Sequence, residues 1–220
     1  MVLLDDDVYQ ATKDIVLGNR APHPIVADLA AWFSMKYSVK VLNIQFGQLK
    51  GPKPNRYRLY VIIENTTDHE KMYVRPSEPN REIQQQVARR FRELALKHRF
   101  AEMSQLEDLF VIYNDFSEEA KTEANWKARP EVEAQIVGKY PAIWKVLTPF
   151  SNLIVFYYSD ADIVANEAAG LSTAIADAYF SILRRYDVLG YFTRENINIK
   201  FDSKENVDAN YEGNLFYYSR

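Results

Sequence analysis

Apolar residues recur at intervals of three and four along several segments of the chain, which is the spacing of an amphipathic helix. On this pattern we predict helices at residues 8–15, 25–37, 81–98, 131–147 and 171–187. The first helix follows the acidic run Asp5–Asp7, and the helix dipole favours negative charge at that end. Pro141 lies inside the fourth helix, where we expect a kink.

Other segments are rich in β-branched and aromatic residues, which is typical of strands. The predicted strands cover residues 39–49, 56–64, 109–116, 153–160, 197–202 and 215–218. Glycine and proline in Lys50–Asn55 indicate a turn, so we expect the first two strands to form an antiparallel hairpin. We expect the last strand to return antiparallel to the fifth through the polar loop 203–212.

From residue 81 onward, predicted helices and strands alternate, which favours right-handed crossovers between parallel strands. Leu109–Tyr113 and Leu153–Tyr157 are continuously apolar, as strands covered on both faces are. The pattern therefore predicts an α/β fold with a mixed, mostly parallel sheet of about six strands and helices packed on it. We expect one domain over residues 1–220, with the helical segment 1–37 packing on the sheet.

Residues 108–115 and 152–160 resemble one another, since each is an apolar run that ends in an acid. The similarity has two explanations. It can reflect an internal duplication, or only the small set of residues from which buried strands are built, and we favour the second.

Composition narrows the classes of function. The 220 residues include no cysteine, which excludes disulfides, thiolate metal sites and cysteine nucleophiles and fits a reducing compartment. We therefore expect a cytoplasmic location. No apolar run approaches the roughly 20 residues of a membrane span, so no membrane association is predicted. The net charge of −3 argues against nucleic-acid binding, which depends on phosphate contacts.

Acidic residues close three of the predicted strands, at Asp115, Asp160 and Asp202. If these strands are parallel, the three carboxylates share the sheet edge at which open α/β folds bind ligands. Such a group could hold Mg²⁺ or act in general acid–base catalysis. The competing interpretation, which we favour, is that these residues cap helices and begin turns.

Stronger catalytic signatures are missing. The loop Asp202–Gly213 has Lys204 and Val207 where a calcium loop requires an oxygen ligand and glycine. The sequence contains no phosphate-binding loop, dinucleotide fingerprint or Gly-x-Ser-x-Gly motif. The sequence therefore leaves the cofactor, and any bound metal, undetermined.

Two groups of residues are candidates for binding. The helix at 81–98 is locally basic, and Arg89, Arg90 and Arg92 could meet an acidic protein or a phosphate group. Tyrosine is abundant, with 15 copies, and Tyr217 and Tyr218 on the last predicted strand could form a contact surface. The alternatives are a solvated helix face for the arginines and ordinary packing for the tyrosines.

The missing catalytic motifs and the many tyrosines favour a non-enzymatic binding protein that recognises another protein. An immunity-type or adaptor role would fit by analogy of size and composition alone. A homo-oligomer is compatible with the same observations. The alternative is a metal-assisted hydrolase or phosphoryl-transfer enzyme that uses the strand-end carboxylates.

Overall fold

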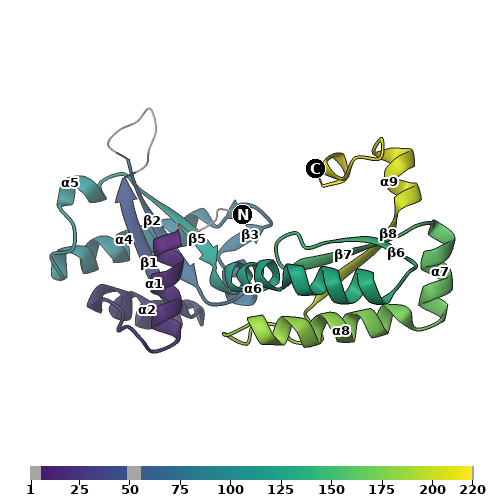
Figure 1. Ribbon diagram of the computed structural model, residues 1–220. Coiled ribbons are helices and arrows are strands. Elements are labelled where there is room, and N and C mark those ends of the chain that lie inside the picture. Colours follow the sequence, from purple (N-terminus) through teal and green to yellow (C-terminus); the bar gives the residue numbers. More distant parts are fainter. Residues whose placement is uncertain (1–5, 49–55, 220) are drawn as a thin grey trace. The chain divides into compact units, whose positions relative to one another are not determined.

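The structure is a computed structural model, and it describes residues 6–48 and 56–219 (Figure 1). The turn predicted at Lys50–Asn55 lies outside these residues. The chain divides into two compact units, Met1–Glu119 and Ala120–Arg220. This division does not test the prediction of one domain over residues 1–220, which stays a prediction.

The predicted single sheet is wrong. The strands form a sheet in the order β1-β2-β5, a small sheet of β3 and β4, and a sheet in the order β6-β7-β8. The fold is therefore mixed α/β, but the two apolar strands β5 and β7 belong to different sheets with different cores. A continuous apolar run indicates that a strand is buried, and it does not identify the strand that pairs with it.

The first unit holds α1 to α5 and β1 to β5. In chain order these are α1 (Asp6–Val16), α2 (Pro24–Tyr37), β1 (Val41–Gln48), β2 (Tyr57–Ile63), α3 (Thr66–Glu70), β3 (Tyr73–Arg75), β4 (Glu78–Pro79), α4 (Arg81–Lys97), α5 (Met103–Leu106) and β5 (Leu109–Asp115). The predicted hairpin is confirmed, since β1 and β2 pair antiparallel, and β5 pairs parallel with β2.

Helices cover both faces of this first sheet. Val87, Phe91 and Leu94 of α4 pack with residues of α2 and with alternate strand residues such as Val61 in one core. On the other face, α1 lies against β1, where Asn43 Nδ2 donates to Thr12 Oγ1 at 3.0 Å.

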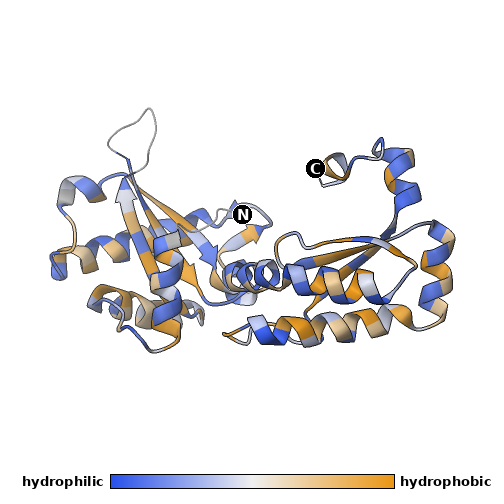
Figure 2. Cartoon of the chain, viewed as in Figure 1, coloured by the Kyte–Doolittle hydropathy of each residue, from blue (hydrophilic) through white to orange (hydrophobic). Residues whose placement is uncertain are grey.

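The second unit begins inside α6. Its elements are α6 (Phe116–Val132), the π-helical turn η1 (Glu133–Val137), β6 (Ile143–Leu147), β7 (Asn152–Tyr157), α7 (Asp160–Ala168), α8 (Leu171–Tyr186), β8 (Asn198–Ser203), α9 (Lys204–Asn210) and α10 (Leu215–Tyr218). β6 and β7 pair antiparallel, and β7 and β8 pair parallel. Figure 2 shows apolar residues along these strands and along α8, whose buried face packs on the sheet.

Two predicted elements of this unit are wrong. The helix predicted at 131–147 is the end of α6, the turn η1 and the strand β6, because Pro141 cannot continue a helix and Ile143–Leu147 pairs with β7. The strand predicted at 215–218 is the short helix α10, which Asn214 caps by accepting from Phe216 N at 2.9 Å.

The two three-stranded sheets have the same topology. In each, an antiparallel pair is followed by a helix and a third strand parallel to the middle one. Each first strand carries an irregularity at the same place, between Val41 and Asn43 in β1 and between Ile143 and Lys145 in β6. The buried residues of α4 and α8 also repeat with one spacing, as 87, 88, 91, 94 and 95 in α4 and as 175, 176, 179, 182 and 183 in α8.

The shared topology defines which residues are equivalent. The middle strands β2 and β7 correspond, and so do the third strands β5 and β8. At their ends, Ile63 pairs with Asp115 and Tyr157 pairs with Ser203. The segments 108–115 and 152–160 are thus not equivalent, and their likeness reflects common apolar composition.

Candidate functional site

Asp115 caps a helix in the first unit. Its Oδ1 accepts from Ser117 Oγ at 2.7 Å and from Glu118 N at 3.3 Å, which satisfies a free amide at the start of α6. Its equivalent in the second unit is Ser203, whose Oγ accepts from Asn206 N at 2.8 Å at the start of α9. The residue at this position therefore caps the following helix in both units.

Asp160 and Asp202 lie together in the second unit, on either side of Ser203. The Ser203 hydroxyl donates to Asp160 Oδ1, and the Ser203 amide donates to Asp202 Oδ1 at 2.8 Å. The single sheet that would have brought Asp115 to the same edge does not exist. The shared rim of three carboxylates was inferred from that sheet and is wrong, and the catalytic role of the three residues stays a prediction.

Asp202 is buried and fully engaged. Tyr218 Oη donates to its Oδ2 at 2.6 Å, Asn206 Nδ2 donates to its Oδ1 at 2.8 Å, and Lys200 Nζ lies 3.1 Å from its Oδ2. Burial acts to raise the pKa of Asp202, but the hydrogen bonds from Tyr218 and its other partners outweigh burial and leave the pKa below the ordinary value. Asp202 is thus an anion that fixes α10 to β8.

In the described part of the chain, histidines and acids do not assemble into a metal site. Within residues 6–48 and 56–219, no group of three or more such side chains could hold a metal ion. His23 Nδ1 accepts from Ile25 N at the start of α2, and His69 Nε2 contacts Tyr113 O at 3.2 Å. The loop that resembled a calcium site is the helix α9.

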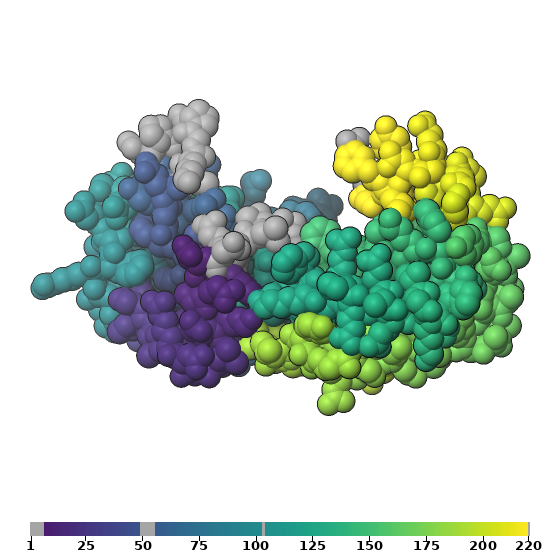
Figure 3. All heavy atoms as spheres, viewed as in Figure 1, coloured from purple at the N-terminus to yellow at the C-terminus, as the bar shows by residue number. Residues whose placement is uncertain are grey.

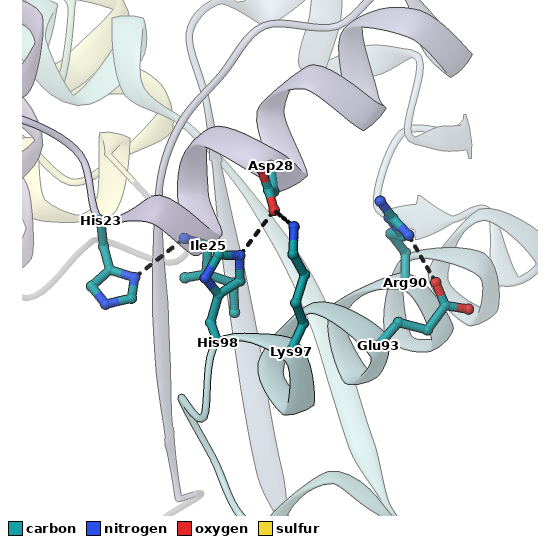
Figure 4. Close-up of polar contacts among 7 residues, drawn as sticks. All are labelled: His23, Ile25, Asp28, Arg90, Glu93, Lys97 and His98. Atoms are coloured by element: carbon teal, nitrogen blue, oxygen red, sulfur yellow. Dashed lines mark hydrogen bonds and ion pairs between the residues drawn. The ribbon is translucent and has the colours of Figure 1, made fainter.

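The basic helix α4 uses most of its charges internally. Arg90 Nη1 donates to Glu93 Oε2 at 2.9 Å, as Figure 4 shows. Arg92 donates to the carbonyls of Leu106 and Glu107 at 2.7 and 3.2 Å, which ties α4 to the end of α5. Arg89 is exposed. Of the three predicted binding arginines, Arg90 is paired within α4 and Arg92 links α4 to α5, and a binding role for all three stays a prediction.

The end of α4 is joined to α2 through Asp28. Lys97 Nζ and His98 Nε2 lie 2.7 and 2.9 Å from the same oxygen, Asp28 Oδ2 (Figure 4). Hydrogen bonds from Lys97 and then from His98 lower the pKa of Asp28 to about 2. Since a free aspartic acid titrates near 3.8, the folded state favours the ionised carboxylate.

Acid should weaken this contact in a defined range of pH. The stabilisation is complete above pH 3.8 and is lost as the pH falls toward 2, because the folded state must then take up the proton. We expect the difference in unfolding free energy between the wild type and Asp28→Asn to shrink over that range, as measured by urea denaturation at several pH values. In a Lys97→Met, His98→Gln background the pH dependence of this difference should be smaller. A difference that does not change between pH 5 and pH 2 would contradict the assignment.

The two tyrosines predicted to bind have different environments. Tyr218 is partly buried on β7 and β8, with its ring 5.0 Å from Phe156 and Lys200 Nζ 4.6 Å from its centroid. Tyr217 is 46% exposed and its neighbour Phe216 is 61% exposed. In Figure 3 the C-terminal residues form a projection on the second unit. Tyr218 therefore anchors α10, and Phe216 and Tyr217 face solvent.

The face of the second sheet away from α8 is a larger candidate surface, which we call the outer face. Its members alternate with the core residues and pair across strands. They are Trp144, Lys145, Leu147, Ile154, Phe156, Lys200 and Asp202. Tyr218 covers the end at Phe156, whereas Trp144, Leu147 and Ile154 are only partly buried and Lys200 is exposed.

The equivalent face of the first sheet is covered. Leu42, Tyr60 and Ile62 take the positions of Trp144, Ile154 and Phe156, and all three are buried. On this side α1 buries Tyr9 and Thr12. One topology therefore presents a closed face in the first unit and a partly open one in the second.

Our sequence interpretation missed this face because it placed residues 131–147 in one helix. The signal was present, since Ile143–Leu147 is a short run of β-branched and aromatic residues just after Pro141. A comparison of the chain with protein-family models, curated proteins and solved structures gave no match. The function is therefore argued from the geometry alone.

Proposed function

We propose that the chain is a non-enzymatic binding protein that recognises another protein through the outer face of its second sheet. The observation that carries the proposal is the contrast between the two units. The first sheet buries Leu42 and Tyr60, and the second leaves their equivalents Trp144 and Ile154 partly exposed. An apolar patch that an equivalent surface buries is a candidate for burial by a partner.

The composition of the outer face supports this role. Trp144 and Ile154 offer apolar area, and Lys145 and Lys200 border it on the two outer strands. Interfaces often combine aromatic anchors with a polar rim. Phe216 and Tyr217 are exposed on α10, beside the Tyr218 anchor, and can extend the contact.

The states of the carboxylates also support binding over catalysis. Asp115 caps α6, and Asp160 accepts from Ser203. Asp202 is held by Tyr218 and Lys200. A catalytic acid or base needs an open approach for substrate, and these groups are engaged with their neighbours.

Capture of partners by variants of the full chain tests the proposal. Ile154→Asp places a charge in the middle of the outer face, and Lys145→Glu reverses a charge at its border. Val164→Asp is the matched control, because Val164 is 70% exposed on α7. Circular dichroism and thermal unfolding establish that each variant is folded before it is used.

We expect the wild type and Val164→Asp to retain the same stoichiometric protein from a lysate of cells that express the chain natively. Ile154→Asp and Lys145→Glu should lose it, with an affinity at least about tenfold lower, or 1.4 kcal/mol. Analytical ultracentrifugation identifies the case in which that protein is a second copy of the chain. Equal retention by all four chains, or no protein above the background of an unrelated bait, contradicts the proposal.

No helix in the described part of the chain has both the length and the apolar composition that crossing a bilayer requires. The cytoplasmic location stays a prediction.

A further inference from the structure

We infer that the partner element bound by the outer face is an amphipathic helix with acidic residues beside its apolar stripe, docked as α1 docks on the first sheet. This inference rests on the proposed function. It names the structure and the charge of the bound segment, which the open face alone does not give.

The first unit supplies the template for this docking. α1 places Tyr9 and Thr12, three residues apart and therefore on one side of the helix, into buried positions. Exposed residues Asp7, Gln10 and Asp14 lie on its other side. The protein thus already contains one sheet of this topology with an amphipathic helix packed on its outer face at β1.

The residue that meets the docked helix differs between the units. In the first, Asn43 follows the strand irregularity, stands opposite Ile62 and donates to Thr12 of α1. In the second, Lys145 follows the same irregularity and stands opposite Phe156. An amide suits the neutral hydroxyl of Thr12, whereas an ammonium group is best matched by a carboxylate. The position equivalent to Thr12 in the partner helix should therefore be Asp or Glu.

A second lysine borders the other side of the apolar row. Lys200 on β8 pairs with Ile154, and its equivalent in the first unit is Ile112 on β5, which pairs with Tyr60. β7 lies between β6 and β8, so Lys145 and Lys200 stand on opposite sides of Ile154 and Phe156. A helix packed against β6 as α1 packs against β1, with one acid facing Lys145 and a second acid on the side toward β8, fits this arrangement.

Part of this positive charge is already balanced. Lys200 Nζ lies 3.1 Å from Asp202, and hydrogen bonds to Tyr218 and then to Asp202 raise the pKa of Lys200. The Lys200 side chain is nevertheless 60% exposed and can meet a second carboxylate. Lys145 stands opposite the apolar Phe156, so it is the residue on which the test is built.

A randomised peptide library, displayed and selected on the full chain, tests the inference. Peptides of about 15 residues are long enough to form a helix on binding. Selection on Ile154→Asp identifies peptides that do not use the outer face, and these are discarded. Synthetic versions of the remaining peptides are measured by fluorescence anisotropy, and their helicity by circular dichroism with and without the protein.

We expect the selected peptides to gain helicity on binding and to carry Asp or Glu beside their apolar stripe. Lys145→Glu should weaken binding at least about tenfold, and replacing the facing acid of the peptide by lysine should restore part of the loss to that variant. Lys139→Glu is the matched control, because it changes the net charge equally at an exposed residue outside the strands. It should leave binding within about twofold, as expected of a distant surface charge.

The outcomes separate the two proposals. Peptides that need Ile154 but bind in an extended form, or without acidic residues, overturn the helix inference and leave the binding face intact. If Lys145→Glu and Lys139→Glu weaken peptide binding equally, the contact assigned between Lys145 and the acid of the peptide is wrong. If every enriched peptide also binds Ile154→Asp, or none is enriched, the helix inference fails. The proposed function is then tested separately, by whether Ile154→Asp and Lys145→Glu lose the protein that the wild type captures from the lysate.

Discussion

Replacing Asn125 with alanine should lower the free energy of unfolding by about 3–5 kcal/mol, since a buried network would lose its centre. Asn125 is fully buried in α6. Its Nδ2 donates to the carbonyls of Phe150 and Asn152 at 2.7 and 2.9 Å, and its Oδ1 accepts from Tyr179 Oη at 2.8 Å. Alanine would leave these three groups without their partner. Urea denaturation followed by circular dichroism measures the change.

Two controls assign this loss to the network. Tyr179→Phe removes one hydroxyl and should cost less, about 1–2 kcal/mol, since only one bond is broken. Burial raises the pKa of Tyr179, as expected of a hydroxyl that stays protonated in this network. Asn198→Ala removes an exposed bond to Asn152 Oδ1 and should cost under about 0.5 kcal/mol. A loss for Asn125→Ala no larger than for Asn198→Ala would contradict the assignment.

Replacing Phe91 with alanine should lower the free energy of unfolding of the first unit by about 3–5 kcal/mol, since it empties a large buried site. Phe91 on α4 is fully buried, with its ring 5.5 Å from Phe46 and 6.1 Å from Phe100. Urea unfolding followed by tryptophan fluorescence measures the loss. Leu96→Ala on the same helix is the control, because Leu96 is 46% exposed and should cost much less.

Phe91→Ala also tests whether residues 1–220 unfold as one domain. Trp32 lies in the first unit, and Trp126 and Trp144 lie in the second, so chains that retain only Trp32 or only Trp144 of the three report on each unit separately. A single cooperative domain requires that Phe91→Ala lower both transitions equally. A shift at Trp32 with none at Trp144 would contradict the prediction of one domain. An unchanged midpoint at both would contradict the packing assigned to Phe91.

Elements with a strong local period were predicted correctly. The stripe of α4 and that of α8 follow the helical repeat, and the hairpin of β1 and β2 was read from alternation and turn residues. The parallel pairing of β7 and β8 was also predicted. Each of these depends on residues close together in the chain, or on a single crossover through α7 and α8.

The missed elements have weak or ambiguous local signals. The middle of the buried side of α6 is formed by three alanines, Ala120, Ala124 and Ala128, and by the polar Asn125, so its apolar stripe is faint in the sequence. In Ile143–Leu147 the apolar spacing fits a helix as well as a strand, and only pairing with β7 identifies it as β6. α10 is a single turn whose cap, Asn214, is equally typical of a loop.

The contacts of the candidate site were also not predictable from local sequence. Asp202 was selected as a strand-end acid, and the sequence shows neither that Tyr218 would reach it nor that Asp115 would lie in another sheet. Lys145 and Ile154 were not selected as site residues from the sequence. The outer face is distinguished by which elements cover it, and no sequence motif marks such a property. The equivalence of Lys145 and Asn43 emerges from strand pairing, since the sequences around them differ.

Periodicity and turn residues alone establish α1, α2, α4 and α8, the hairpin and the α/β class of this chain, because backbone geometry and the burial of one face act within a few residues. The partners of β5 and β7, and the open face of the second sheet, come from contacts between segments far apart in the chain. Many apolar strands satisfy the same local pattern, so the choice among them is made by packing against the helices of each unit.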